Sequence, residues 1–441
     1  MLKEEDIEIS LKCQQFECQT YMRSSDEKQS VLIFESKRNT EDVSCPYCGG
    51  KVHICDLTSK CLRDMPIWSG VAQEVNFVCH RYRCTQCGRK HTEQIPVQYP
   101  GTRITDRAAE WIKTLLLNKI TIKGVQAITH IHWETIRNLH REIMETTLQE
   151  HWEGLKAQGY KPKFLAVDEF AIHKGHTYAT CVMDLATGDV LWVGNGRSKA
   201  DFLLFFDEIE HSFLTDVVAV AMDMNASYYQ VVQEKLPQAQ IVYDRYHMQA
   251  QFGKDVLGAV RLQEAYSHKA CAQELQRQLA DIPTCDKPAA KAAIRAERQE
   301  YSKIKKLRWT LLADGEELTE CQSKELSDIL SEHANLAVCY AMKEEMIRLF
   351  DIRNLPEAEI GWRRWFEAAK ESGVPALAHF AELKEKRIDG LIAHALYPVS
   401  TGRLEGFNNK IKVAKRIGYG YRDDHYFFTL VRFLSLSPNF P

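Results

Sequence analysis

The chain has 441 residues and a mass of 50.8 kDa, so two to four domains are expected rather than one. Hydrophobic residues make up 45% of it and charged residues 27%, which excludes a wholly disordered, collagenous or coiled-coil protein. The formal net charge is −3, so any surface for a polyanionic partner must be a local one. The N-terminus lacks the pattern of a signal peptide and the apolar runs are too short to cross a bilayer, so we expect a soluble, cytoplasmic protein with no membrane partner.

Two cysteine motifs lie in a strand-rich segment that follows an N-terminal segment, residues 1–40. Cys45 and Cys48 form one C-x-x-C-G motif, and Cys84 and Cys87 form a second. In each motif the glycine permits the left-handed turn that lets backbone amides face two thiolates. We therefore predict a structural four-cysteine zinc site in a zinc ribbon over residues 41–100. Redox motifs, or an iron–sulfur centre that includes Cys79, are the alternatives, and His53, Cys55, Cys61 and His80 are nearby residues that could replace one ligand.

Helical spacing of apolar residues in 101–155 favours a helix-turn-helix DNA-binding domain. Residues 122–130 would form the supporting helix and residues 133–141 the recognition helix, whose Arg137 and Arg141 are candidate DNA contacts. His130 stands where the turn commonly has glycine, so an ordinary helical hairpin remains an alternative. The expected core of the motif is Val125, Ile128, Ile131, Ile136 and Leu139, with Ala127 as the small residue for close helix packing.

Two aspartates follow apolar runs in residues 160–253, where the pattern changes to strands. Asp168 ends the run 164–167, and Asp223 ends the run 217–222. If these strands are neighbours, the two carboxylates meet at the rim of a sheet, within reach of a shared metal. Further strands are predicted at 240–243 and in a hairpin formed by 178–185 and 190–193, with a helix at 202–209. Surface charges or strand-end caps are the expectation for Glu169, Asp184, Asp189 and Asp244.

A third acid, Glu405, lies on a predicted helix that follows a long amphipathic helical stretch, residues 254–395. The segment 401–422 has six lysines and arginines and one acid, a local charge of +5 in a chain whose total is −3. Such an imbalance favours contact with a phosphate backbone over an ordinary solvated face. The apolar face of the helix is Leu404, Phe407, Ile411 and Ala414, and its polar face is Glu405, Asn408, Asn409, Lys412, Lys415 and Arg416. The candidate phosphate contacts are Lys410, Lys412, Lys415 and Arg416.

Three carboxylates beside a basic helix suit metal-dependent phosphodiester chemistry. Cleaving or transferring a phosphodiester requires neutralising charge on the attacking and leaving oxygens, which two Mg²⁺ ions (or Mn²⁺) held by hard carboxylate oxygens do. Asp168, Asp223 and Glu405 are the predicted ligands and catalytic residues. Taken singly, each acid is better explained as an ordinary surface charge; the two strand ends and the basic helix together favour a site.

Several blocks resemble those of bacterial DDE transposases, most closely the insertion-sequence family ISL3. They are FLAVDEF (164–170) with HKGHTY (173–178), AMDM (221–224), IVYDRYH (241–247), RWTLL (308–312), GRLEGFNNKIK (402–412), KR (415–416) and GYGY (418–421). The resemblance implies a ribonuclease-H-like core with Asp168, Asp223 and Glu405 as its DDE triad. It also implies a transposase that binds the terminal inverted repeats of its element, cleaves the ends with Mg²⁺ and joins the freed 3′-hydroxyl to target DNA.

Further expectations concern weaker residues, partners and organisation. His247 could contact DNA or support the site, with a packing role equally open, and Trp309 could stack on a base, although core packing is the preferred explanation. We expect DNA as partner, a homo-oligomer of at least two copies on paired ends, and a bacterial cytoplasmic location on the nucleoid. A catalytically inactive DNA-binding regulator and a structure-specific nuclease are the alternatives. The predicted fold class is multi-domain α/β: N-terminal segment 1–40, zinc ribbon 41–100, helix-turn-helix 101–155, ribonuclease-H-like core 160–253 and 396–441, and helical insert 254–395.

Overall fold

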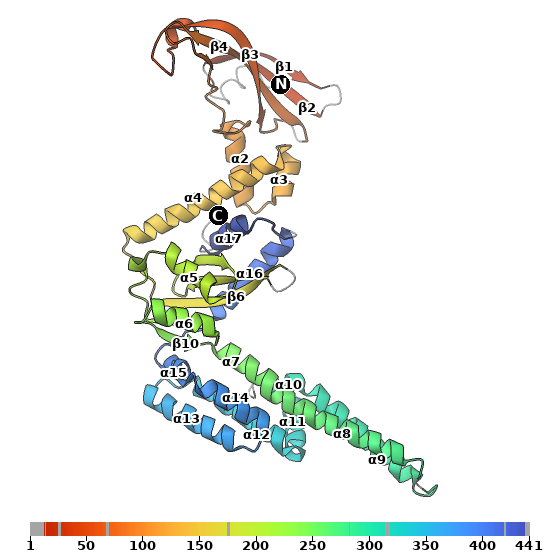
Figure 1. Cartoon of the computed structure of the whole chain (residues 1–441). Coiled ribbons are helices and arrows are strands. Elements are labelled where there is room, and N and C mark those ends of the chain that lie inside the picture. The colour runs from red at the N-terminus through yellow and green to blue at the C-terminus, as the bar shows by residue number, and fades with distance from the viewer. Residues whose placement is uncertain are drawn as a thin grey trace. The chain divides into compact units, whose positions relative to one another are not determined.

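The computed structural model describes residues 13, 15–24, 28–67, 70–173, 177–281, 283–313, 315, 318–418 and 420–436 (Figure 1). Residues 174–176 and Tyr419, which belong to two of the quoted blocks, lie outside these ranges. The chain forms two compact units. The first contains the chain up to Gly154 together with Tyr421–Phe433, and the second contains Leu155–Gly420 and a short segment from Leu434. This confirms a mixed α/β protein with more than one unit.

The sheet of the first unit is built around its longest strands. It contains β1 (Phe16–Arg23), β2 (Gln29–Ser36), β3 (Val52–Asp64), β4 (Ala72–Cys84) and β5 (Lys90–Thr92), and η1 (Thr40–Asp42) precedes β3. The strand order is β1-β2-β4-β3, with β5 also paired to β4. Alternate side chains of β2 and β4, among them Leu32, Phe34, Val75 and Phe77, are fully buried in one core. Strands from the predicted segments 1–40 and 41–100 thus share one sheet, and no boundary separates them at residue 40.

Three helices follow the sheet in the first unit: α2 (Asp106–Leu117), α3 (Ile122–Thr129) and α4 (Trp133–Ala157). Thr105 and Thr121 cap the first two by accepting from backbone amides. His130 ends α3 in the left-handed conformation, with φ 58°, at the position where the sequence lacks a glycine. Val125, Ile131, Ile136 and Leu139 are buried as expected. Ile128 and Ala127 are exposed, so their predicted core roles are wrong, because the short α3 buries Val125 and Thr129 on its other face.

The last helix, α17 (Asp424–Ser435), belongs largely to the first unit, although the sequence placed residues 396–441 together in the core. The Arg137 side chain of α4 forms an ion pair with Asp423, and its guanidinium lies 4.6 Å from the ring centroid of Tyr426. Nδ1 of His140 is 2.5 Å from the hydroxyl of Tyr426. These contacts join residues 286 positions apart, which local sequence patterns cannot indicate.

The sheet of the second unit has the order β10-β9-β6-β7-β8. Its strands are β6 (Phe164–His173), β7 (Thr177–Asp184), β8 (Val190–Asn195), β9 (Ala219–Met222) and β10 (Gln240–Tyr243). β6, β7 and β8 run antiparallel, which confirms the predicted hairpin, whereas β9 and β10 run parallel to β6. Two helices, α5 (Lys199–Glu208) and α6 (Ala226–Lys235), pack Phe202, Phe205 and Tyr228 against one another, and η2 (His211–Phe213) precedes β9.

Helices make up the rest of the second unit, and the described part of 254–395 contains no strand. In Figure 1, α8 and α9 run side by side as a long hairpin. A second group, α12 to α15, buries aromatic side chains such as Trp362 and Phe366. The elements are α7 (Arg245–Phe252), the π-helical turn η3 (Gly253–Leu257), α8 (Gly258–Gln278), α9 (Lys287–Lys306), α10 (Arg308–Leu312), α11 (Glu320–Glu332), α12 (Ala334–Leu349), α13 (Leu355–Glu371), α14 (Pro375–Glu385), α15 (Ile388–Ile392), η5 (Ala393–Ala395) and α16 (Gly402–Ile417). None of the helices in the described ranges is long and apolar enough to cross a membrane.

Candidate functional site

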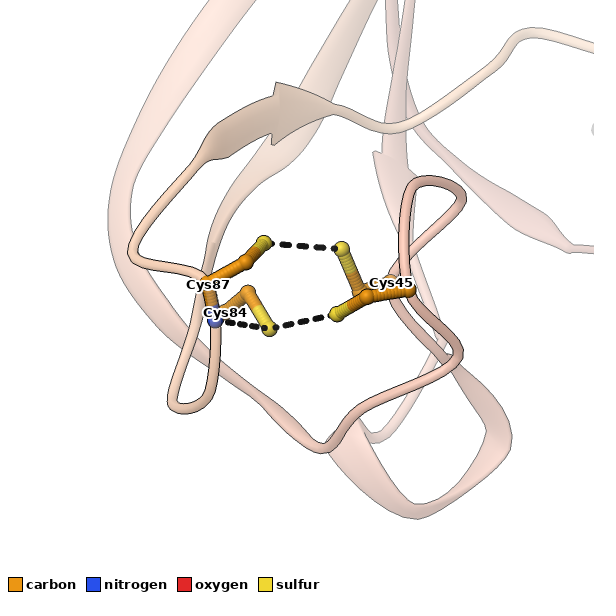
Figure 2. Close-up of side chains that lie close together, drawn as sticks. Cys45, Cys84 and Cys87 are labelled. Atoms are coloured by element: carbon orange, nitrogen blue, oxygen red, sulfur yellow. Dashed lines mark hydrogen bonds between the residues drawn. The ribbon is translucent and has the colours of Figure 1, made fainter.

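The four predicted zinc ligands lie together at one end of the first sheet. One sulfur atom from each of Cys45, Cys48, Cys84 and Cys87 lies within 4.8 Å of the others. Cys45 and Cys87 are 3.7 Å apart at Sγ, and Cys48 and Cys84 are 3.5 Å apart. Figure 2 shows the thiol groups of Cys45, Cys84 and Cys87 pointing toward one another from two loops. Sulfur atoms around a tetrahedral zinc are about 3.8 Å apart, so this donor set fits a closed structural metal site.

Local backbone geometry explains why the thiols converge. Gly49 and Gly88, the last residues of the two motifs, have φ of 71° and 70°, the left-handed turn that the motif requires. The Cys84 sulfur accepts from the backbone N–H of Cys87 at 3.4 Å and of Gln86 at 3.3 Å. These amides, that of Cys87 first, lower the pKa of Cys84 to about 6, which favours the thiolate that binds metal.

The spare ligands near this cluster have other surroundings. Cys79 is fully buried in the sheet core beside Phe77, where burial raises the pKa of its thiol to about 11. It is not one of the four clustered cysteines, which counts against the iron–sulfur alternative. Cys55 and Cys61 lie on β3 and contact Arg81 and Glu74. His80 lies 4.0 Å from Glu93.

The two predicted aspartates lie on neighbouring strands of the second unit. β6 and β9 pair in parallel from Phe164 with Ala219 to Val167 with Met222, so Asp168 and Asp223 occupy the next position of each strand. Parallel neighbours are about 4.8 Å apart, which brings the two acids to one edge. Asp168 does not end its strand as predicted, because β6 continues to His173 by pairing with β7 alone. Asp168 lies at the point where β9, the parallel neighbour of β6, ends.

Glu405 reaches the same place from α16. A cavity of about 480 Å³ in the second unit is lined by all three acids. The Thr401 hydroxyl lies 3.2 Å from Oε1 of Glu405 and connects the acid to the start of its helix. Leu404, Phe407 and Ile411 are buried, as the predicted apolar face requires. The other lining residues are Val167, Glu169, Tyr178, Asn225, Tyr228, Tyr246, His247, Asn408, Asn409 and Lys412.

His247 lies between two of the acids. Its Nδ1 is 3.9 Å from Oδ2 of Asp223, and its Nε2 is 3.5 Å from Oε1 of Glu405. Asp244 caps α7 by accepting from the amides of Tyr246 and His247, and its other oxygen accepts from the amide of Thr401 at 2.8 Å. One buried carboxylate therefore aligns the helix that carries His247 with the helix that carries Glu405. Atoms of Asp244, His247 and Glu405 lie within 4.8 Å of one another.

Asn408 is a functional candidate that the sequence pattern predicted only as part of the polar face of its helix. It is 8% exposed, and its Nδ2 donates to Oδ2 of Asp168 at 2.9 Å. Its Oδ1 is buried and has no hydrogen-bond partner among the described residues, so this oxygen has an electron pair that no described group uses. The signal was its spacing, since a residue three positions after Glu405 lies on the same helical face.

Burial governs the protonation of Asp168. It raises the pKa of the carboxyl to about 6; the amide of Glu169 and the imidazole of His247 oppose this rise, and the charges of Glu405 and Glu169 add to it. An anion in this position is destabilised mainly by burial, and a bound cation would offset that penalty. Hard carboxylate oxygens and an unpaired amide oxygen are donors that suit Mg²⁺ or Mn²⁺.

The four acids that were expected to be surface charges or strand-end caps have three kinds of surroundings. Glu169 lines the cavity, with Arg197 at 3.4 Å and the Tyr228 hydroxyl at 3.4 Å. Asp244 is a helix cap, as the cap interpretation allowed. Asp184 and Asp189 are buried at the β7–β8 turn, so they are not solvated charges.

Arg403 connects α16 to the sheet. Its guanidinium donates to the backbone oxygens of Leu185 and Ala186 at 2.7 and 2.9 Å and to that of Thr187 at 2.6 Å. All three carbonyls belong to the turn between β7 and β8. Arg403 is two residues before Glu405, so this contact helps to fix the position of that acid.

The candidate phosphate contacts differ in availability. Lys410, Lys412 and Arg416 are exposed on α16, and Lys412 also lines the cavity. Lys415 donates to the backbone oxygen of Ala171 at 2.7 Å, and burial lowers its pKa. In the first unit Arg141 is half-buried and lies 3.8 Å from Glu145, whereas Arg137 forms an ion pair with Asp423.

Trp309 departs from its preferred explanation. Trp309 is 72% exposed, and the Arg308 guanidinium lies 4.9 Å from the centroid of the Trp309 ring. Core packing is therefore wrong for Trp309. An exposed aromatic ring stays available for stacking.

Comparison with known proteins gives the family. The chain is 33% identical over 408 residues to the transposase for insertion sequence element IS1001 of Bordetella parapertussis, covering 91% of each protein. It is 28% identical over 261 residues to the transposase for insertion sequence element IS1557 of Mycobacterium tuberculosis, covering 58% of this chain and 56% of that one. The family model for transposases of the ISL3 DDE type matches residues 165–431, which include Asp168, Asp223 and Glu405. The chain belongs to this family, the DDE transposases of the ISL3 type.

Proposed function

We propose that the protein binds the terminal inverted repeats of its insertion sequence, cleaves the DNA at those ends and joins the freed 3′-hydroxyl to target DNA. The observation that carries this proposal is the shared cavity of Asp168, Asp223 and Glu405. The acids come from β6, the end of β9 and α16, and Lys412 adds a positive charge to the cavity lining, which suits a charged phosphodiester. Family membership implies an enzyme that acts on DNA and uses divalent metal ions.

The core would have a ribonuclease-H-like fold. Three antiparallel strands followed by two strands parallel to the first, in the order β10-β9-β6-β7-β8, support this assignment. The helices from α8 to α15 separate β10 from α16 in the chain, as an insert would. The first unit would provide a zinc ribbon at the cysteine cluster and a helix-turn-helix at α3 and α4, joined by the turn at His130.

Asp168, Asp223 and Glu405 would hold the catalytic metal, two Mg²⁺ ions or Mn²⁺, and Cys45, Cys48, Cys84 and Cys87 would hold structural Zn²⁺. The catalytic cations supply neutralisation of charge on the attacking and leaving oxygens. The chain's own groups orient these ligands. Asn408 fixes one oxygen of Asp168, and Asp244 aligns the helices of His247 and Glu405. No serine or tyrosine nucleophile is required, since water and the DNA 3′-hydroxyl are the attacking groups.

Lysines and arginines would position the DNA. Lys410, Lys412 and Arg416 can contact phosphates directly, because they are exposed on α16. Lys412 also lines the cavity of the acids. For Lys415 and Arg137 a phosphate would compete with Ala171 and Asp423, and for Arg141 with Glu145. His247 would hold a position between Asp223 and Glu405 near the reacting phosphate, and exposed Trp309 could stack on an unpaired base.

Two DNA ends must be brought together, so we propose a homo-oligomer of at least two copies on paired ends. The protein would act in the bacterial cytoplasm and would be located on the nucleoid when bound to DNA. The partners would be the transposon ends and the target DNA.

The test uses the full chain, a duplex carrying one terminal repeat, and Mg²⁺. We expect nicking at the end of the repeat by the wild type and none by Asp168→Asn. A pre-cut end should then be joined to a supercoiled plasmid. End binding without nicking would favour the inactive regulator, and nicking without joining would favour a structure-specific nuclease. A scrambled duplex, which should be neither bound tightly nor nicked, is the control for specificity.

A further inference from the structure

A second cluster of metal-ligating side chains lies among the helices of the second unit. Glu300 comes from α9, Glu332 ends α11, and His333 joins α11 to α12. One donor atom of each lies within 4.8 Å of the others. None of the three lines the cavity of the catalytic acids.

The histidine is the informative member. His333 is 7% exposed, and its Nε2 is buried without a hydrogen-bond partner among the described residues. The nearest acid atom is Oε1 of Glu300 at 3.9 Å, which is also buried and also lacks a hydrogen-bond partner there. Leaving such a buried group unsatisfied destabilises the fold. Two of them facing each other are explained by a ligand that accepts electron pairs from both.

The surroundings of these two atoms already hold them in place. Nδ1 of His333 faces Oε2 of Glu264, on α8, at 3.5 Å. Oε2 of Glu300 accepts from Lys303 at 2.9 Å, which leaves Oε1 directed toward His333. A metal-bound histidine characteristically directs its second ring nitrogen to a carboxylate, which orients the ring and increases its basicity. Glu264 is the carboxylate that faces Nδ1, and this distance would have to shorten for it to take that role.

Direct ion pairing is a weaker account of the same geometry. A protonated His333 would face Glu264 and Glu300 at 3.5 and 3.9 Å, both longer than the 2.7–3.2 Å or so of a formed N–H···O bond. An ion between Nε2 and the carboxylate oxygens needs no proton on Nε2.

We propose that Glu300, Glu332 and His333 form a binding site for a divalent transition-metal ion. One imidazole nitrogen with two carboxylates suits Zn²⁺ or Mn²⁺ better than Mg²⁺, which prefers oxygen ligands alone. The ion would join α9 to the α11–α12 junction, with Glu264 adding α8, and so brace the helical segment between β10 and α16. Its role is structural, and it is distinct from both the cysteine cluster and the catalytic acids.

The experiment measures metal content of the full chain. Protein is equilibrated with micromolar free Zn²⁺ and millimolar Mg²⁺, the latter to occupy the catalytic acids, and bound zinc is counted by mass spectrometry of the elements. We expect one equivalent in addition to that of the cysteine cluster. His333→Gln and the isosteric Glu300→Gln should each lose that equivalent. Glu325→Gln, an exposed acid-to-amide change elsewhere on α11, should keep it.

A second measurement guards against loss through misfolding. Protein that holds one equivalent of Zn²⁺, enough for the cysteine cluster alone, is titrated with Co²⁺, whose weak visible bands at a nitrogen–oxygen site differ from the intense sulfur-to-cobalt bands of a cysteine site. The weak bands should appear in the wild type and in Glu325→Gln, and they should be absent from the two cluster variants while circular dichroism stays unchanged. Equal zinc content in wild type and variants, or no equivalent beyond the cysteine cluster, would overturn the proposal. Neither measurement depends on cleavage of DNA.

Discussion

The cysteine cluster and the acid cavity bring their ligands together in different ways. Each C-x-x-C motif supplies two thiols within four residues, and the antiparallel pairing of β3 with β4 brings the two motifs together. The three acids are 55 and then 182 residues apart, and they meet through a parallel strand pair and the docking of α16. The first arrangement is local, whereas the second depends on the tertiary structure of the whole unit.

The difference also extends to what each site can do. Four thiols at 3.5–3.7 Å across the cluster leave no open position, which suits a structural metal. The acids border a cavity of about 480 Å³ that leaves space for a substrate. We therefore expect substitutions at the cysteines to affect stability and substitutions at the acids to affect chemistry.

The largest effect is expected for Cys84→Ser. It removes the thiol with the lowered pKa, and structural zinc sites contribute on the order of 10 kcal/mol to folding. The variant should lose one equivalent of zinc, and the cysteine end of the first sheet should lose protection from hydrogen exchange. Cys271→Ser, which changes an exposed cysteine outside the cluster, is the matched control. Full zinc content in Cys84→Ser would remove the distinction between the two sites.

A large effect on activity with little effect on stability is expected for Asp168→Asn. The change keeps the shape of the side chain and its contact with Asn408 but removes the charge that a metal requires. Cleavage of end-containing DNA should fall by at least about a thousandfold, or roughly 4 kcal/mol in activation free energy. Asp207→Asn, at an exposed position of α5, should cleave normally. Comparable loss in both variants would contradict a special role for the cavity.

Acid should weaken the contact between α4 and α17, the long-range element of the first unit. Burial lowers the pKa of His140 to about 4, so the folded protein keeps this histidine neutral while the unfolded chain takes up a proton below pH 6.5. The stabilisation is complete above pH 6.5 and is lost as the pH falls toward 4, by up to about 3 kcal/mol at 1.36 kcal/mol for each pKa unit.

The measurement is denaturant unfolding of wild type and His140→Gln between pH 7 and pH 4. The difference between their free energies of unfolding should shrink as the pH falls. Asp423 stabilises the same contact in a lower pH range. The amide of Tyr426 and then Arg137 lower its pKa from the ordinary value of 3.8, so its stabilisation is lost only as the pH falls below 3.8. A pH-independent difference between the two proteins would show that His140 is protonated equally in both states.

The smallest of these effects is expected for Arg403→Ala, which tests how far the acid site depends on docking. Without its bonds to the 185–187 turn, α16 should hold Glu405 less firmly. We expect a roughly tenfold fall in cleavage and a higher Mg²⁺ concentration for half-maximal activity, with partial rescue by Arg403→Lys. Arg348→Ala, an exposed change on α12, is the control. Reduced activity with unchanged Mg²⁺ dependence would indicate a role in DNA binding instead.

Local patterns predicted the elements of the fold well. The strand at 240–243 and the hairpin of β7 and β8 agree with their predictions, because apolar runs and turn residues carry that information locally. The two cysteine motifs carried their own turn geometry. Local patterns did not predict which elements pack together. β1 and β2 belong to the same sheet as the strands of the cysteine segment, and α17 contacts α4.

Side-chain surroundings were the least predictable feature. Trp309 and Ile128 are exposed although both are apolar. The sequence could not predict this, because it does not show which helix faces pack against other elements. Asn408 and Asp244 entered the acid site through contacts with Asp168 and Thr401, which lie 240 and 157 residues away. Glu300 and His333 carry no motif at all, so only packing of α9 against the α11–α12 junction brings them together.

The sequence by itself determined the cysteine motifs, the strands, the amphipathic helices and the three candidate acids, because each depends on residue type and short spacing. Tertiary structure alone decided that β6 and β9 are neighbours, that α16 brings Glu405 to the cavity and that His333 faces Glu300. The physical reason is that these contacts arise from burying apolar faces of distant elements against each other. Which faces pack together depends on all the elements of the unit and not on any single segment.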